Sequence, residues 1–150
     1  MNKERNQKLA RNSILAALYV VMTLLNPLGW GPWQFRISEI LLVIPFIKKE
    51  YTSGAIIGVA IANVFSPLGI IDIFTGVAVT SLAYILGIWI KNNYINAISF
   101  SIISAILVGL ELNMVFQAPL LFTMITILLP QLVITFTGVW LFSNDKRIRL

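Results

Sequence analysis

The segment Gln34–Glu39 (QFRISE) places two charged side chains where one long apolar run has ended and the next begins. Arg36 and Glu39 are three residues apart, so on a helix they share one face. Ionisable side chains at membrane depth are costly, and they usually face a cavity or a partner rather than lipid. The pair therefore predicts a polar site inside a helical membrane bundle.

The composition is that of an integral membrane protein. Of the 150 residues, 58% are hydrophobic and 11% are charged, and the mean hydropathy is +0.88, whereas soluble domains carry about 25% charged residues. So few polar residues cannot cover a surface that faces water. The chain has no cysteine and no histidine, which excludes thiol catalysis and removes the commonest metal ligand. We expect no metal site and no cofactor.

The order of apolar and polar segments predicts an all-α membrane protein with six transmembrane helices in one domain, residues 1–150. Residues 1–12 form a basic lead and residues 143–150 a basic tail. The second and third helices are shorter than the roughly 20 residues of a straight span. The charged turn between them would be costly inside hydrocarbon, which favours two short spans over one broken hairpin. The predicted helices are 13–25, 37–47, 52–65, 70–90, 95–110 and 119–142.

The basic residues indicate how the bundle lies in the membrane. With six spans, ten of the eleven Lys and Arg residues fall in the lead, the tail and the two connections on the same side. Only Arg36 falls on the other side. Because Lys and Arg concentrate in cytoplasmic loops, we expect a multi-pass protein of the cell membrane with both termini cytoplasmic. This asymmetry also explains the net charge of +5 without a nucleic-acid-binding surface.

Acidic and amide side chains gather at the outer level instead. Glu39, Asp72 and Glu111 lie near the outer ends of the second, fourth and fifth predicted helices, Asn63 ends the third, and Asn113 follows the fifth. Such residues can also be helix caps or interfacial groups that reach toward water, but their number at one level favours an outward-facing pocket. The candidate substrate-binding residues are Gln34, Arg36, Glu39, Asn63, Asp72, Glu111, Asn113 and Trp33.

The sequence contains no phosphate-binding GxxxxGK[ST] loop, so it does not predict ATP hydrolysis by that route. A chain of 150 residues makes one small bundle rather than two repeats around a midplane site. A single bundle with a pocket open to the outside suits ligand capture better than autonomous pumping.

Several strings of residues resemble one family over about residues 14–141. It is the QueT family, whose members are substrate-specificity (S) components of energy-coupling factor (ECF) transporters. A departure occurs at Pro130 and Gln131, where the family pattern leads us to expect a Gly-Glu pair. The strings are Gln34–Glu39 (QFRISE), Leu42–Phe46 (LVIPF), Ile61–Gly69 (IANVFSPLG) with Asp72 and Gly76, and Gly109–Leu112 (GLEL).

The resemblance implies a fold, a function and partners. The family fold is a six-helix bundle, and its inferred substrates are queuosine precursors: 7-deazaguanines with a cyano or aminomethyl group, or queuine. The subunit would not be an enzyme, because two separate ATPase subunits and a coupling transmembrane protein would supply the energy. S components resemble one another in small residues on the first helix, where the coupling protein docks. Here these are Ser13, Ala16 and Ala17.

The chemistry of such a ligand matches the candidate residues. A guanine-like base shows two adjacent donors beside a carbonyl, and a carboxylate can accept both donors. Glu39, Asp72 or Glu111 can fill this role, while Gln131, Asn63 or Gln34 can donate to the carbonyl. The outer charges, Arg36 included, balance at −2, which would suit a cationic substituent if Arg36 pairs with one acid. Trp33 lies beside the site and can stack a flat base for about 1–3 kcal/mol, or belong to an interfacial aromatic belt.

Three alternatives stay open on the residues alone. The chain can be an S component for another vitamin-like molecule, because fold does not determine substrate. It can be an accessory membrane subunit whose polar cluster consists of internal ion pairs. A membrane enzyme is the third, since acids and Arg36 can transfer protons, but no nucleophile–base pair is visible.

Overall fold

The computed structural model describes residues 3–26, 29 and 34–144, and all regular secondary structure in these ranges is helical. The elements are α1 (Lys3–Leu24), η2 (Ile37–Val43), α2 (Ile44–Ile47), η3 (Lys49–Tyr51), α3 (Thr52–Asn63), α4 (Ile70–Leu86), α5 (Asn93–Phe116) and α6 (Leu120–Ser143). Within the described ranges, α1, α4, α5 and α6 are long α-helices and α3 is a shorter one, and short 3₁₀ and α segments lie between α1 and α3.

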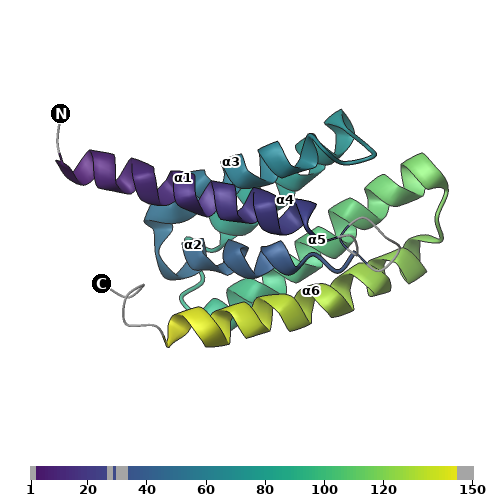
Figure 1. Ribbon diagram of the computed structural model, residues 1–150. Helices are drawn as coiled ribbons and strands as arrows, with labels where there is room; N and C mark the ends of the chain where they lie inside the picture. The colour runs from purple at the N-terminus through teal and green to yellow at the C-terminus, as the bar shows by residue number, and fades with distance from the viewer. Residues whose placement is uncertain (1–2, 27–28, 30–33, 145–150) are drawn as a thin grey trace.

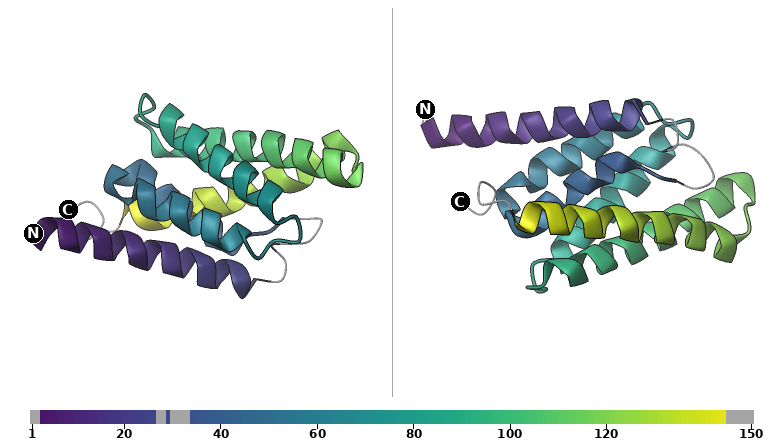
Figure 2. Two further views of the ribbon diagram at one scale, coloured as in Figure 1. Left: turned by 90° about the horizontal axis from the view of Figure 1, so that it is seen from above. Right: turned by 60° about the horizontal axis from the view of Figure 1, so that its bottom comes forward.

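The elements form a closed ring of neighbours, in which elements that follow one another in the chain run antiparallel and α1 runs parallel to α3. Helix α1 packs on α3, α3 on α4, α4 on α5 and α5 on α6, and η2 closes the ring between α6 and α1. Figures 1 and 2 show η2 and α2 lying between α1 and α6. The start of α1, the end of α6 and the α2–α3 and α4–α5 connections share one end of the bundle (Figure 1). The α3–α4 and α5–α6 connections lie at the other end, here called the site end.

The second predicted helix differs most from its expected form. Residues Ile37–Val43 form a 3₁₀ helix, and only Ile44–Ile47 continue as α-helix. Runs of 3₁₀ helix longer than three or four residues are uncommon, and they often mark functional segments. With three residues per turn, Arg36 and Glu39 lie one above the other, and the Glu39 N–H donates to the Arg36 carbonyl over 3.0 Å. Their shared face is therefore set by 3₁₀ geometry.

Helix ends depart from the predicted boundaries in both directions. Helix α1 begins at Lys3, so the basic lead is largely helical, and α4 ends at Leu86. Helix α5 runs on to Phe116, which corrects the prediction that Asn113 follows the helix. Local capping explains the other end of α5, because Asn92 Oδ1 accepts from the Tyr94 N–H over 2.9 Å. Such caps satisfy backbone donors that would otherwise lack partners.

Glycines allow α1 and α3 to touch closely. A Cβ at Gly54 would lie 2.5 Å from the Asn12 carbonyl oxygen, and a Cβ at Gly58 would lie 3.0 Å from Ala16 Cα. Asn12 also ties the two helices together, since its Oδ1 accepts from the Gly54 N–H over 2.7 Å. Small residues at four-residue spacing let helices approach in this way. These glycines therefore serve the internal packing of α1 against α3.

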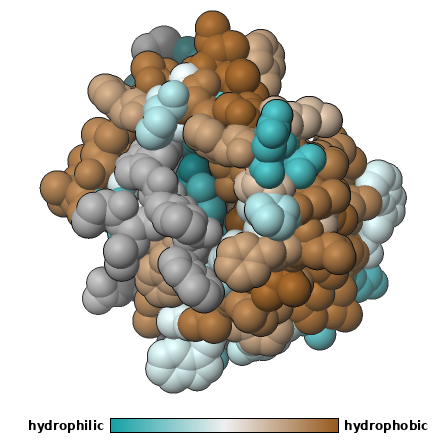
Figure 3. Space-filling model, turned by 90° about the vertical axis from the view of Figure 1, so that its right-hand side faces the viewer, coloured by the Kyte–Doolittle hydropathy of each residue, from teal (hydrophilic) through white to brown (hydrophobic). Residues whose placement is uncertain are grey.

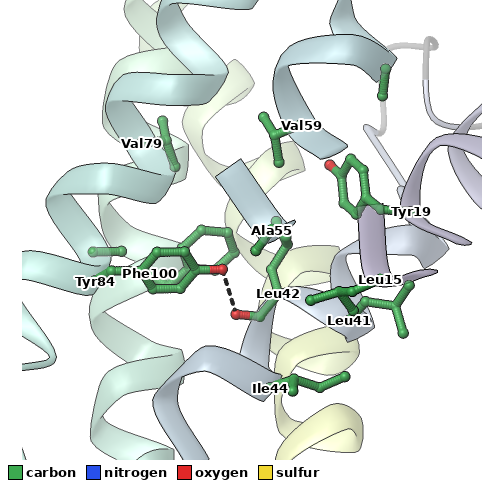
Figure 4. Packing of buried hydrophobic residues seen from close by; sticks show 12 residues of the cluster. Leu15, Tyr19, Leu41, Leu42, Ile44, Ala55, Val59, Val79, Tyr84 and Phe100 are labelled. Carbon is green, nitrogen blue, oxygen red and sulfur yellow. Dashed lines mark hydrogen bonds between the residues drawn. The ribbon is translucent and has the colours of Figure 1, made fainter. Parts of the chain in front are cut away.

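The core lies inside the ring and is mostly aliphatic and aromatic. Tyr19 of α1, Leu42 of η2 and Phe100 of α5 are at most 2% exposed. Figure 4 shows these side chains converging, with the Tyr84 hydroxyl donating to the Leu42 carbonyl over 2.9 Å. This bond satisfies a carbonyl of the 3₁₀ segment and ties α4 to η2. The core therefore holds η2 in the middle of the bundle.

The outer surface is strongly apolar. Two helices, α5 and α6, are long and apolar enough to cross a membrane, and the segments 37–47 and 70–86 are shorter apolar helices. In Figure 3, a largely hydrophobic surface surrounds hydrophilic residues near the middle of the site end. Soluble proteins rarely expose such extensive apolar area, so this surface fits contact with lipid. Exposed apolar residues on the helices include Leu18, Val21, Ile57, Ile61, Phe74, Leu82, Ile102, Leu121, Ile125 and Val133.

We predict that Gly54→Leu destabilises the protein by about 1–3 kcal/mol, the usual cost of overpacking a tight contact. The new side chain must push α1 away from α3 and break the Asn12–Gly54 hydrogen bond. The measurement is thermal unfolding in detergent. The control is Ala78→Leu, which makes a similar addition at an exposed position of α4. Equal melting temperatures for the two variants would contradict the close α1–α3 contact.

Candidate functional site

The Arg36 guanidinium forms the centre of the polar cluster at the site end. Arg36 is 8% exposed, and it reaches three parts of the chain. Its Nε donates to the Gly29 carbonyl over 3.0 Å, and its Nη1 donates to Asn63 Oδ1 over 3.3 Å. Its Nη2 lies 3.5 Å from Asp72 Oδ2 in a buried ion pair. Arg36 therefore joins the start of η2 to the last residue of α3 and the first turn of α4.

A second set of contacts holds Asn63 and Asp72 in place for Arg36. The Asn63 side-chain nitrogen donates to the Asp72 backbone carbonyl over 2.9 Å. Both the oxygen and the nitrogen of this amide are therefore hydrogen-bonded. A Cβ at Gly76 would collide with Asn63 Nδ2, so this position has room only for glycine. Asn63 and Asp72 are both buried. These two residues position the guanidinium and are already engaged with it.

The other two carboxylates are buried but poorly satisfied. Glu39 is 8% exposed and Glu111 is 5% exposed. Within the described residues, both carboxylate oxygens of Glu111 lack a hydrogen-bond partner, and so does Oε2 of Glu39. Gln131 of α6 lies beside the Glu39 carboxylate, and its Nε2 also lacks a partner of good geometry. Buried polar groups normally find partners, so these atoms are available to a ligand or to water.

Two small cavities lie against these groups and share Arg36, Asp72 and Val108 as walls. The outer cavity has a volume of about 60 Å³ and the inner one about 20 Å³. Ligand pockets usually measure about 300–1,000 Å³, so the site is contracted. The outer cavity is lined by Gln34, Ser66, Pro67, Leu68, Glu111, Leu112 and Phe116, and the inner one by Tyr19, Glu39, Leu42, Val59, Gly76, Val79, Thr80, Phe100 and Ser104.

The structure gathers five of the predicted residues around Arg36 and these cavities, and places Asn113 elsewhere. Asn113 does not line either cavity, because its amide donates to the Ala118 carbonyl over 2.7 Å and holds the α5–α6 turn. Trp33 lies outside the described residues. Gln34 lines the outer cavity and adopts a positive φ of 43°. No group of three acidic residues in the described ranges is arranged to hold a metal ion. The gathered residues are Gln34, Glu39, Asn63, Asp72 and Glu111.

Several lining residues were absent from the predicted set. Tyr19 and Ser104 line the inner cavity, and Ser66 lines the outer one. A periodic signal was present for Ser104, which lies seven residues before Glu111 on the same face of α5. Tyr19 gave no such signal, because a tyrosine in an apolar helix is also an ordinary core residue.

A larger, mostly apolar hollow lies away from this chemistry. It has a volume of about 310 Å³ and lies between α2, α3 and α4 near the opposite end of the bundle. Its lining is apolar apart from Lys49, Thr52, Ser81 and the Tyr84 hydroxyl, and the Tyr84 hydroxyl already donates to the Leu42 carbonyl. This hollow offers few groups that could orient a polar ligand.

The predicted docking residues on α1 divide between two faces. Ala16 is buried against Gly58 of α3, so it belongs to the internal α1–α3 contact. Ser13 and Ala17 are exposed, and they lie four residues apart on the outer face of α1. A docking role for this outer face stays a prediction.

Comparison with known proteins places the chain in a family. The family model described as QueT transporter matches residues 9–144. The chain belongs to the QueT family. A curated relative, the queuosine precursor transporter QueT of Lactococcus lactis subsp. cremoris (strain MG1363), is 31% identical over 169 residues, which cover 100% of this chain and 99% of the relative. No solved structure matches.

Membership of the QueT family confirms the resemblance drawn from the sequence strings. The family match runs through every element of the polar cluster, from Arg36 at the start of η2 to Glu111 near the end of α5. A transporter family and an apolar outer surface agree in describing a membrane protein. The buried, partly unsatisfied site is therefore the place to look for the transported ligand.

We predict that Arg36→Met destabilises the protein strongly. Removing one partner of a buried ion pair typically costs about 3–5 kcal/mol, because the other charge is left uncompensated. The double variant Arg36→Met/Asp72→Asn removes that charge and is expected to recover part of the lost melting temperature. The control is Arg11→Ala, whose 3.6 Å pair with Glu50 is half exposed and contributes about 0–1 kcal/mol. No recovery in the double variant would contradict the pairing.

Proposed function

We propose that this chain is the substrate-binding subunit of an ECF-type uptake transporter and that it captures queuosine precursors from outside the cell. The observation that carries the proposal is a buried cluster with unpaired carboxylate oxygens, at one end of a bundle, in a QueT family member. The curated relative, which the match covers over 99% of its length, is a queuosine precursor transporter by name. The expected ligands are 7-deazaguanines with a cyano or aminomethyl group, or queuine.

The proposal includes a topology of six passes with the site end outside. The arrangement of the chain supports this topology, because the start of α1, the end of α6 and two connections share one end of the bundle (Figure 1). Lys48 and Lys49 lie in one of these connections and Lys91 in the other. Since short cytoplasmic loops are rich in Lys and Arg, this end faces the cytoplasm. The two termini are then cytoplasmic, and Arg36 is at the outer level.

The contracted cavities bear on how capture works. A deazaguanine cannot enter volumes of about 60 and 20 Å³, so binding requires the walls at the site end to separate. The Arg36–Gly29 hydrogen bond links Gly29 to the polar cluster, so this bond must lengthen or break when the walls separate. Once the ligand is enclosed, its polar atoms replace water at buried oxygens, where hydrogen bonds to charged groups contribute about 1.5–3 kcal/mol each.

Transport itself requires partners. The chain carries no phosphate-binding loop, so we propose that two ATPase subunits and a coupling transmembrane protein supply the energy. The outer face of α1, marked by Ser13 and Ala17, is the proposed contact with the coupling protein. Small side chains there allow close approach of a partner helix.

We predict that the purified chain alone binds 7-deazaguanines and rejects 7-deazaadenine by about 100-fold or more. A site that hydrogen-bonds specific groups excludes analogues lacking them, because its own buried groups would be left unpaired. Titration of the 7-cyano base, the 7-aminomethyl base, queuine and 7-deazaadenine, followed by calorimetry in detergent, measures this. Failure of every base to bind would remove the proposed substrate. Tight binding of an unrelated vitamin would reassign it.

We predict that Ala17→Trp leaves ligand affinity within about twofold and abolishes uptake into cells that supply the partner subunits. The bulky side chain projects from the exposed face of α1, away from both cavities, and would keep a partner helix at a distance. Ala78→Trp, at an exposed position of α4, is the matched control. Intact uptake by Ala17→Trp would contradict docking on this face.

A further inference from the structure

We propose that the two unpaired carboxylates divide one ligand between them, with Glu39 and Gln131 binding the polar edge of the base and Glu111 binding a positively charged substituent. The site would therefore select a cationic precursor over a neutral one of similar shape. This inference rests on the proposed function, because it concerns the same ligand and the same site.

The acids at the site outnumber the nearby basic side chains. Arg36 lies in an ion pair with Asp72 and also donates to Asn63 and Gly29. Glu39 and Glu111 remain, and both are more than nine-tenths buried. A buried charge without a counter-charge is strongly unfavourable. Arg36 is shared among three acids, Asp72, Glu39 and Glu111, and a cationic ligand would add a second positive charge to them.

Glu39 and Gln131 form a matched pair of acceptor and donor. Oε2 of Glu39 and Nε2 of Gln131 are both buried and without partners, and the two side chains are neighbours across η2 and α6. The guanine-type edge has two N–H donors next to a carbonyl. A carboxylate that accepts the donors beside an amide that donates to the carbonyl is complementary to it. The Gln131 departure from the expected acid therefore supplies a donor.

The inner cavity has suitable walls for the flat part of the ligand. Glu39 lines it together with the rings of Tyr19 and Phe100, each 1% exposed. Aromatic walls favour a planar base once the cavity has widened. Asn63 cannot take the donor role foreseen for it, because its amide is engaged with Arg36 and Asp72.

Glu111 has a different environment. Both of its oxygens lack partners, and its polar side-chain neighbours on α4 are Asp72 and the Thr75 hydroxyl. It lines the larger, outer cavity with Gln34 and Ser66, toward which the substituent of a base held at Glu39 would extend. An ammonium group can donate to both oxygens at once.

The test compares two ligands that differ in charge on the purified full-length chain. Wild type is expected to bind 7-aminomethyl-7-deazaguanine at least tenfold more tightly than the neutral 7-cyano base. Glu111→Gln should weaken the aminomethyl base by about 10–100-fold, as expected for loss of a charge-assisted contact, and the cyano base by less than threefold. Glu39→Gln should weaken the binding of both bases. Gln131→Leu should weaken both as well, by loss of the carbonyl contact.

Two further variants keep the test decisive. Glu111→Asp retains the charge and should retain the preference for the cation. Glu50→Gln removes an acid that pairs with Arg11 and Lys48 far from the site, and it should change neither affinity. In the absence of ligand, Glu111→Gln should not lower the melting temperature, because it removes a buried charge without a partner.

The outcomes separate the inference from the function beneath it. If wild type binds neither base, the proposed function fails. If wild type binds both but Glu111→Gln keeps the same ratio of affinities, only the assignment of Glu111 fails. Equal weakening of both bases by Glu111→Gln would likewise overturn the division of roles, as would an unchanged affinity of both bases in Glu39→Gln.

Discussion

The buried ion pair between Arg36 and Asp72 is the interaction on which the rest of the site depends. It joins the 3₁₀ segment η2 to α4, and Asn63 extends it to α3. Buried ion pairs contribute little net stability, because desolvation offsets their attraction. Their value lies in geometry: η2, α3 and α4 must keep one relative position for every donor to be satisfied.

The use of Arg36 within the protein determines what remains for a ligand. Because its guanidinium is held by Gly29, Asn63 and Asp72, Glu39 and Glu111 form no direct ion pair within the described residues. The same arrangement explains why the cavities are small: the side chains close over one another until something displaces them. The site therefore carries excess buried negative charge and unsatisfied hydrogen-bond acceptors. The ligand that complements it best has both hydrogen-bond donors and a positive charge.

The frame around the site follows a simpler rule. Its outer face is largely apolar along α4, α5, α6 and the second half of α1, and its buried carboxylates gather at the site end. Glycines let α1 and α3 come close, and the Tyr84–Leu42 hydrogen bond holds η2 inside the ring, as Figure 4 shows. A rigid frame leaves the site end as the place where a conformational change can occur at least cost.

The sequence by itself determined the class of the protein, the positions of its helices and the family, because apolar runs and breaking residues act locally. It also indicated that Arg36, Glu39, Asp72 and Glu111 belong to one level. It misjudged Asn113, since nothing local ends α5 before Phe116. Only the tertiary structure decided which acid pairs with Arg36, that Ala16 faces α3, and that Gln131 stands beside Glu39. Such pairings depend on which helices are neighbours and how they are rotated, and that is a property of the packed ring rather than of any segment.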